Sequence, residues 1–164
     1  MVSTIKYVKG NLLESDCDYI CHQVNCQGRM NAGIAKQIRC CFPEVYEQYM
    51  KRYEDTIWRG RGGEVLLGSI DIVRLRESNR CVINMYSQAD YGFDKTRYTS
   101  YDAFAMALQE IKIEVPVGCT IAFPKNIGCG LGGGNWYIIS TLIEEILGDE
   151  YEVYIYELEG GFAN

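Results

Sequence analysis

The chain has 164 residues with 48% hydrophobic and 23% charged residues, and its formal net charge is -6. This length and composition exclude a largely disordered or fibrous chain, and we expect a single domain over residues 1–164. The acidic balance disfavours nucleic-acid binding, which usually needs a basic surplus. No apolar run approaches the ~20 residues that cross a bilayer, and no signal-peptide pattern opens the sequence, so we expect a cytoplasmic protein without a membrane partner.

Eight cysteines and one histidine limit the metal and disulfide chemistry of the chain. Most of the cysteines lie in apolar runs, where they act as small buried hydrophobic residues. No Cys-x-x-Cys pair is present, and the spacing of Cys17, Cys21 and Cys26 does not match a zinc site. We therefore expect neither a metal site nor a cofactor.

Strand-like and helix-like segments alternate along the chain. Apolar alternation predicts strands at residues 4–8, 18–25, 64–75, 81–86, 119–123 and 151–158. Helices are predicted at residues 33–41, from Pro43 onward, at residues 99–113 and after Asn135. This order predicts an α/β fold with a mostly parallel sheet and helices on both faces. Ligands in such folds bind beyond the carboxyl ends of the strands.

Two glycine-containing loops occupy that position. The first glycine loop, residues 24–35, leaves a strand and enters a helix, and it contains Gly28 and Gly33. Asn25, at the end of the strand, can hydrogen-bond a ribose hydroxyl or can simply form the turn, and the sequence leaves both roles open.

The second glycine loop, residues 125–134, carries five glycines within seven residues. Bare backbone N–H groups beside a helix N-terminus bind phosphate. Gly128, Gly130 and Gly133 spell G-x-G-x-x-G, but only one strand follows, which disfavours a dinucleotide dehydrogenase. Two such loops at one sheet edge can enclose a diphosphate from both sides with few cations.

The runs at residues 22–28, 33–35 and 124–136 resemble those of the macro domain family. Within that family the chain is most similar to the branch that contains ADP-ribose-1''-phosphate processing enzymes and terminal ADP-ribose glycohydrolases. The resemblance covers nearly the whole chain. It implies a three-layer α-β-α fold with a mixed, mostly parallel central sheet and a site for ADP-ribose.

The resemblance also implies where the ligand lies. Asn11 and Leu12 are expected at the adenine end, where Asn11 replaces the usual Asp, and Tyr156 is expected to flank adenine unless it only packs in the sheet. Asn25 is expected near the distal ribose. The remaining expected contacts, along the diphosphate and the ribose, are Gly33, Ile34, Ala35, Asn126, Gly128, Cys129, Gly130, Leu131, Gly132 and Gly133.

Catalytic groups are harder to assign. Glycohydrolases of this branch use a Lys and an Asp, but Gln88 and Gly132 stand near those positions, which disfavours that mechanism. Phosphatase members carry a His three residues before the strand-end Asn, as His22 does here. The candidate catalytic residues are His22, Asn25 and Asp90, with a core role for His22 and a solvated-acid role for Asp90 as alternatives.

Two function classes stay open. One is a hydrolase that removes a group from the distal ribose, either phosphate from ADP-ribose-1''-phosphate or an ADP-ribosyl adduct. The other is a non-catalytic ADP-ribose-binding module. The expected partners are ADP-ribose or a derivative, and an ADP-ribosylated protein is a further candidate. We expect the chain to act as a monomer.

Overall fold

One six-stranded sheet organises the protein in the computed structural model, which describes residues 5–158. The strands lie in the order β1-β6-β5-β2-β4-β3. Only the β3–β4 pair is antiparallel, so the sheet is mixed and mostly parallel, as expected. The strands are β1 (Ile5–Lys9), β2 (Tyr19–Asn25), β3 (Ile70–Arg74), β4 (Cys81–Gln88), β5 (Thr120–Pro124) and β6 (Glu152–Glu157).

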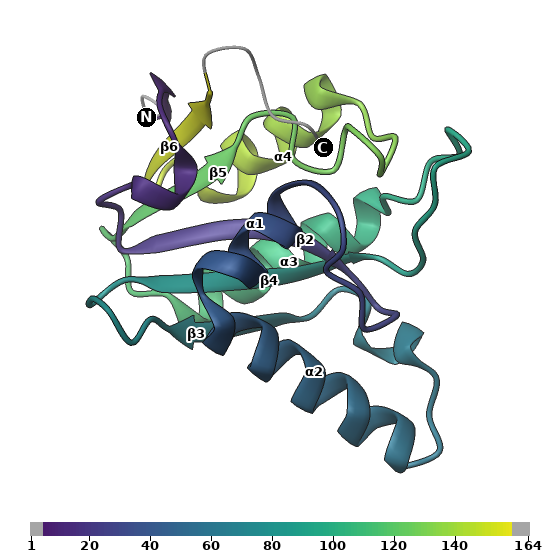
Figure 1. The fold of residues 1–164 in the computed structure, drawn as a ribbon. Coiled ribbons are helices and arrows are strands. Elements are labelled where there is room, and N and C mark those ends of the chain that lie inside the picture. Colours follow the sequence, from purple (N-terminus) through teal and green to yellow (C-terminus); the bar gives the residue numbers. More distant parts are fainter. Residues whose placement is uncertain (1–4, 159–164) are drawn as a thin grey trace.

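Helices cover both faces of the sheet (Figure 1). The described helices are α1 (Gly33–Cys41), α2 (Pro43–Trp58), α3 (Tyr101–Glu114) and α4 (Trp136–Leu147), with 3-10 turns at Leu12–Glu14 and Gly63–Leu66. Side chains of α1 and α2 pack on one face of β2 and β4, and side chains of α3 and α4 pack on the other. The structure therefore confirms the three-layer α-β-α architecture.

Local sequence signals explain where three helices begin. Pro43 occupies the first turn of α2, where its missing N–H costs nothing. Ser100 caps α3 by accepting a hydrogen bond from the N–H of Ala103. Asn135 caps α4 by accepting from the N–H groups of Tyr137 and Ile138.

The strand expected over residues 64–75 is only partly present. Its first residues belong to the 3-10 turn Gly63–Leu66, and β3 begins at Ile70. Gly63 passes so close to the first glycine loop that a Cβ there would lie 1.8 Å from the carbonyl oxygen of Cys26. Tight packing against that loop, rather than strand pairing, sets this segment. Thr4, expected to open β1, lies outside the described residues.

No helix within residues 5–158 is both long and apolar enough to cross a bilayer.

Candidate functional site

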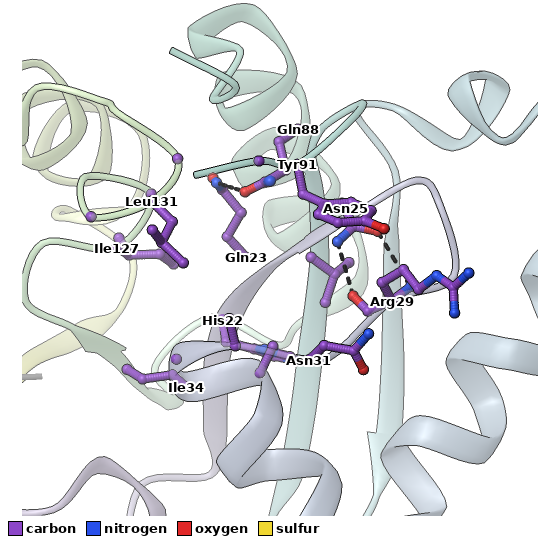
Figure 2. Close-up of a pocket in the computed structure, with 18 of the residues that line it drawn as sticks. His22, Gln23, Asn25, Arg29, Asn31, Ile34, Gln88, Tyr91, Ile127 and Leu131 are labelled. Atoms are coloured by element: carbon purple, nitrogen blue, oxygen red, sulfur yellow. Dashed lines mark hydrogen bonds between the residues drawn. The ribbon is translucent and has the colours of Figure 1, made fainter. Parts of the chain in front are cut away.

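A pocket of about 230 Å³ lies at the carboxyl ends of the parallel strands, between the two glycine loops. Its lining comes from the end of β2 and the first glycine loop with the start of α1, from the end of β4 and the loop after it, and from the end of β5 and the second glycine loop. In Figure 2, Asn25 and Arg29 lie on one side of the pocket and Ile127 and Leu131 on the other. The structure thus places the two glycine loops on opposite walls of one pocket.

Asn25 holds the first glycine loop in shape. Its side-chain oxygen accepts hydrogen bonds from the N–H of Gln27 at 2.9 Å and from the hydroxyl of Tyr49 at 2.8 Å. Its side-chain nitrogen donates to the carbonyl oxygen of Arg29 at 2.9 Å. The hydroxyl of Tyr49 stays protonated, because burial raises its pKa. The turn-forming role of Asn25 is therefore real, and one hydrogen of its amide remains for a ligand.

The start of α1 combines unused backbone donors with residues that line the pocket. Ala32, the N-cap residue, gives no side-chain cap. Gly33, Ile34 and Ala35 line the pocket, and their N–H groups have no hydrogen-bond partner within residues 5–158. Unsatisfied N–H groups at the positive end of a helix dipole are the usual backbone site for an anion.

The second glycine loop provides a second set of backbone N–H groups on the opposite wall. Gly130, Leu131 and Gly132 line the pocket, and in the described part of the chain their N–H groups are also unpaired. The helix after this loop does not contribute its own N-terminus, because Asn135 caps the first N–H groups of α4. The helix dipole at the site comes from α1, not from α4 as the glycine pattern alone indicated.

Side chains from β2 and from the loop after β4 fix the path of the second glycine loop. Thr99 Oγ1 donates to the carbonyl oxygen of Gly128 at 2.6 Å, and its N–H donates to the carbonyl oxygen of Gly132. Gln23 Nε2 donates to Thr99 Oγ1 at 2.9 Å and to Gln88 Oε1 at 2.6 Å. A Cβ on Gly132 would lie 2.5 Å from Thr99 Oγ1, so this position needs glycine.

The rim of the pocket carries exposed side chains. Tyr91 and Phe93, in the loop after β4, line the pocket and are 42% and 73% exposed. Arg29 is an exposed cation on the rim, and its guanidinium has no partner among the residues that the structure describes. The rim therefore combines two aromatic rings with one unpaired positive charge in an acidic protein.

His22 lines the pocket yet is only 1% exposed. Its Nε2 lies 2.5 Å from Oδ1 of Asn84 on β4. Burial lowers the pKa of His22 to about 4, so the ring is neutral at physiological pH. Of the catalytic and core roles considered for His22, its burial fits the core role, and the residue also lines the pocket.

Asp90 does not join His22 and Asn25. It is exposed, it is not among the lining residues, and its carboxylate accepts from the N–H of Tyr91. Asn11 caps the 3-10 turn Leu12–Glu14 through a hydrogen bond to the N–H of Leu13, and Leu12 is fully buried. Neither residue of this expected adenine end lines the pocket.

The remaining expected contacts divide between the pocket and its surroundings. Tyr156 pairs with Val8 and Pro124 in the sheet, and Pro124 itself lines the pocket. Asn126, Cys129 and Gly133 belong to the second glycine loop but lie outside the lining. Burial raises the pKa of the Cys129 thiol to about 11, so the thiol is protonated near neutral pH.

Sequence reasoning did not assign several lining residues. Gln23 is a polar residue of β2 beside His22, and Tyr91 and Phe93 follow a strand that ends at the same sheet edge. The polar residue on β2 and the aromatic residues after β4 are both visible in the sequence. Of the others, five lie on the loops that the glycine pattern already marked: Val24, Arg29, Asn31, Ala32 and Ile127. Gln88 and Pro124 end β4 and β5, and Gly92 lies in the loop after β4.

The sequence is similar to those of several known proteins. No protein-family model matches the chain. The "Uncharacterized 17.5 kDa protein in tk-vs intergenic region" of Enterobacteria phage T4 is 28% identical over 144 residues, covering 85% of this chain and 88% of that protein. The DNA ADP-ribosyl glycohydrolase of Thermus aquaticus is 27% identical over 160 residues, covering 93% of this chain and 41% of that protein. The chain therefore spans less than half of the length of this second relative.

Solved structures agree with these sequence relatives. The macrodomain of Thermus aquaticus DarG is similar at a TM-score of 0.71 with 27% identity, covering 93% of this chain and 97% of that chain. Thermosipho africanus DarTG, solved in complex with ADP-ribose, has a TM-score of 0.75 with 21% identity, covering 96% of this chain and 42% of that chain. The likeness to the macrodomain of Thermus aquaticus DarG spans nearly the whole chain in both sequence and structure, so the chain has the macrodomain fold.

Proposed function

We propose that the chain binds ADP-ribose between its two glycine loops and hydrolyses the bond between the distal ribose and a substituent. The observation that carries the proposal is that two sets of residues lining one pocket, Gly33–Ala35 and Gly130–Gly132, have N–H groups without a hydrogen-bond partner within residues 5–158. A diphosphate presents oxygen atoms to both sides and can accept from both sets. The relative solved with ADP-ribose supports this choice of ligand.

The substituent that we favour is an ADP-ribosyl adduct on a macromolecule, because the relative from Thermus aquaticus is named a DNA ADP-ribosyl glycohydrolase. In the reaction water adds to the anomeric carbon, the bond to the carrier breaks, and the proton lost by water passes to the leaving group. Asn25 would hold the ribose, and the N–H groups at the start of α1 and in the second glycine loop would hold the diphosphate. ADP-ribose-1''-phosphate, with phosphate as the leaving group, is the second substrate candidate.

One observation favours the alternative, a binding module without turnover. Of the three catalytic candidates, Asp90 lies outside the pocket lining and His22 has a pKa lowered to about 4 by burial. General acid–base catalysis works best with a pKa near the working pH. The lining thus supplies ligand donors more clearly than it supplies a catalytic acid.

The test uses three substrates with the same ADP-ribosyl group: an ADP-ribosylated oligonucleotide, an ADP-ribosylated protein and ADP-ribose-1''-phosphate. Released ADP-ribose is measured by chromatography, and free phosphate is measured for the third. We expect ADP-ribose from at least one macromolecular adduct. If all three stay intact while calorimetry shows that ADP-ribose binds, the protein is a binding module.

A further inference from the structure

A row of buried polar side chains crosses three strands next to the pocket. The strand register pairs His22 on β2 with Asn84 on β4, and Asn84 with Asp71 on β3. His22, Asn84 and Asp71 are 1%, 0% and 6% exposed, in strands that are otherwise mostly apolar. Buried polar groups are normally hydrogen-bonded, so the direction of each bond in this row can be worked out.

Asp71, at one end of the row, sets the direction of the hydrogen bonds. Its carboxylate accepts from Arg52 Nη1 at 2.7 Å, from the hydroxyl of Tyr86 at 2.6 Å and from Asn84 Nδ2 at 3.1 Å. Burial raises the pKa of Tyr86, which keeps that hydroxyl a donor. A carboxylate can only accept, so Asn84 must turn its amide nitrogen toward Asp71.

The orientation of Asn84 then decides the tautomer of His22. With its nitrogen toward Asp71, Asn84 presents its carbonyl oxygen to His22 Nε2, 2.5 Å away. A carbonyl oxygen carries no hydrogen, so Nε2 must be the protonated ring nitrogen. In a neutral ring Nδ1 is then an acceptor with a free lone pair.

This acceptor has no partner in the protein. Within residues 5–158, Nδ1 of His22 is the one buried side-chain nitrogen or oxygen that lacks a hydrogen bond. Such orphaned groups are rare in native proteins and point to a ligand, a water or strain. Figure 2 places His22 and Ile34 on the lower side of the pocket, opposite Gln88 and Tyr91. The unused acceptor therefore belongs to a side chain that lines the pocket.

We propose that Nδ1 of His22 accepts a hydrogen bond from a hydroxyl or amino group of the bound ligand, and that Arg52, Asp71 and Asn84 are positioning residues that keep it an acceptor. The inference rests on the proposed ADP-ribose site and adds a specific contact to it. ADP-ribose carries ribose hydroxyls and an adenine amino group, which are donors of the required kind. The row of side chains thus favours a ligand that donates a hydrogen bond to Nδ1 of His22 over a ligand that can only accept one.

Nitrogen-15 NMR tests the proposal directly, because the chain contains one histidine and its ring signals need no assignment. Free protein should show Nε2 protonated and Nδ1 unprotonated at pH 7. ADP-ribose should shift the Nδ1 signal toward that of a hydrogen-bonded nitrogen. If calorimetry shows binding while the Nδ1 signal stays unchanged, this contact is wrong and the proposed function stands. If ADP-ribose does not bind, both fail.

Variants separate positioning from mere stability. Asp71→Asn frees the amide of Asn84 to rotate, so we expect a mixture of His22 tautomers and a weaker ADP-ribose affinity, by roughly 2- to 10-fold for one hydrogen bond. Tyr86→Phe also removes a hydrogen bond to Asp71 but leaves Asn84 oriented, so tautomer and affinity should match the wild type. An unchanged tautomer in folded Asp71→Asn protein, or equal affinity losses in both variants, would overturn the positioning role.

Discussion

The hydroxyl of Thr99 donates a hydrogen bond of 2.6 Å to the carbonyl oxygen of Gly128, and so ties the loop after β4 to the second glycine loop. The same hydroxyl accepts from Gln23 on β2. Thr99 is 2% exposed, so the link lies beneath the pocket rather than in it. The path of a glycine-rich loop, which its own residues leave free, is therefore fixed by a side chain that is distant in sequence.

Thr99→Val keeps the shape of this side chain and removes its hydroxyl. We expect the free energy of unfolding to fall by about 1–2 kcal/mol, because the carbonyl oxygen of Gly128 and the amide of Gln23 lose a partner. ADP-ribose affinity should fall by roughly 3- to 10-fold as the loop loosens. Chemical denaturation and calorimetry measure the two effects. Thr141→Val, which removes a hydroxyl from α4 outside the pocket, is the matched control and should leave affinity unchanged.

Asn25→Ala should weaken binding through the first glycine loop. The variant loses the hydrogen bonds to Gln27, Tyr49 and Arg29 that shape this loop. We expect an affinity loss of roughly tenfold or more and a Tm lower by a few degrees. Asn79→Ala, at an exposed position whose side-chain oxygen accepts a hydrogen bond from Arg74, serves as the control. Wild-type affinity in Asn25→Ala would show that the shape of the first glycine loop does not matter for the ligand.

Gly132→Ala tests whether backbone or side chains hold the anion. The new Cβ would lie 2.5 Å from Thr99 Oγ1 and 2.7 Å from the carbonyl oxygen of Gly128, so the loop must move. We expect calorimetry to show at least tenfold weaker ADP-ribose binding, because the displaced N–H groups no longer face the diphosphate. Lys125 already pairs with Glu157, and Lys125→Ala should stay within about threefold of the wild type. A larger loss in Lys125→Ala would favour an ordinary cationic phosphate site.

Stability should depend on pH through His22. Burial lowers its pKa from the ordinary 6.5 to about 4, so below pH 6.5 the unfolded chain takes up a proton that the folded chain refuses. Neutral His22 therefore contributes its full share of the free energy of unfolding above pH 6.5. This share falls by about 1.4 kcal/mol per pH unit as the pH drops from 6.5 toward 4.

The measurement compares urea denaturation of the wild type and of His22→Phe between pH 4 and 7.5. Carboxylates with lowered pKa, such as Glu44 and Glu157, titrate in both proteins and cancel in the difference. The wild type should lose more stability than the variant as the pH falls. Parallel pH curves would mean that His22 is not buried in its neutral form.

Much of the fold could be predicted because its signals are local. Pro43, Ser100 and Asn135 stand at the starts of their helices, and the element order gives a mostly parallel sheet. The segment from Gly63 to Leu66 could not be predicted, since its apolar residues resemble a strand. Its shape comes from a close approach to Cys26 in another part of the chain.

Parts of the candidate site could likewise be predicted from the sequence, and other parts could not. The glycine pattern marked both loops, and His22 and Asn25 do line the pocket between them. The exposed position of Asp90 depends on how its loop leaves β4, which no local motif encodes. The link from Asp71 through Asn84 to His22 depends on strand register across three strands, and only a polar residue in an apolar run hinted at it.

We propose that two sets of backbone donors, on opposite walls of one pocket, hold the diphosphate of ADP-ribose. A calorimetric titration of the purified protein with ADP-ribose, with NAD in parallel, tests it most directly. We predict saturable binding of one ADP-ribose per chain, and a Tm raised by a few degrees at a hundred times the Kd, which corresponds to about 2.7 kcal/mol. NAD should bind more weakly, because nicotinamide occupies the distal ribose carbon that we propose the first glycine loop encloses. No heat with ADP-ribose, or an equal affinity for NAD, would contradict the account.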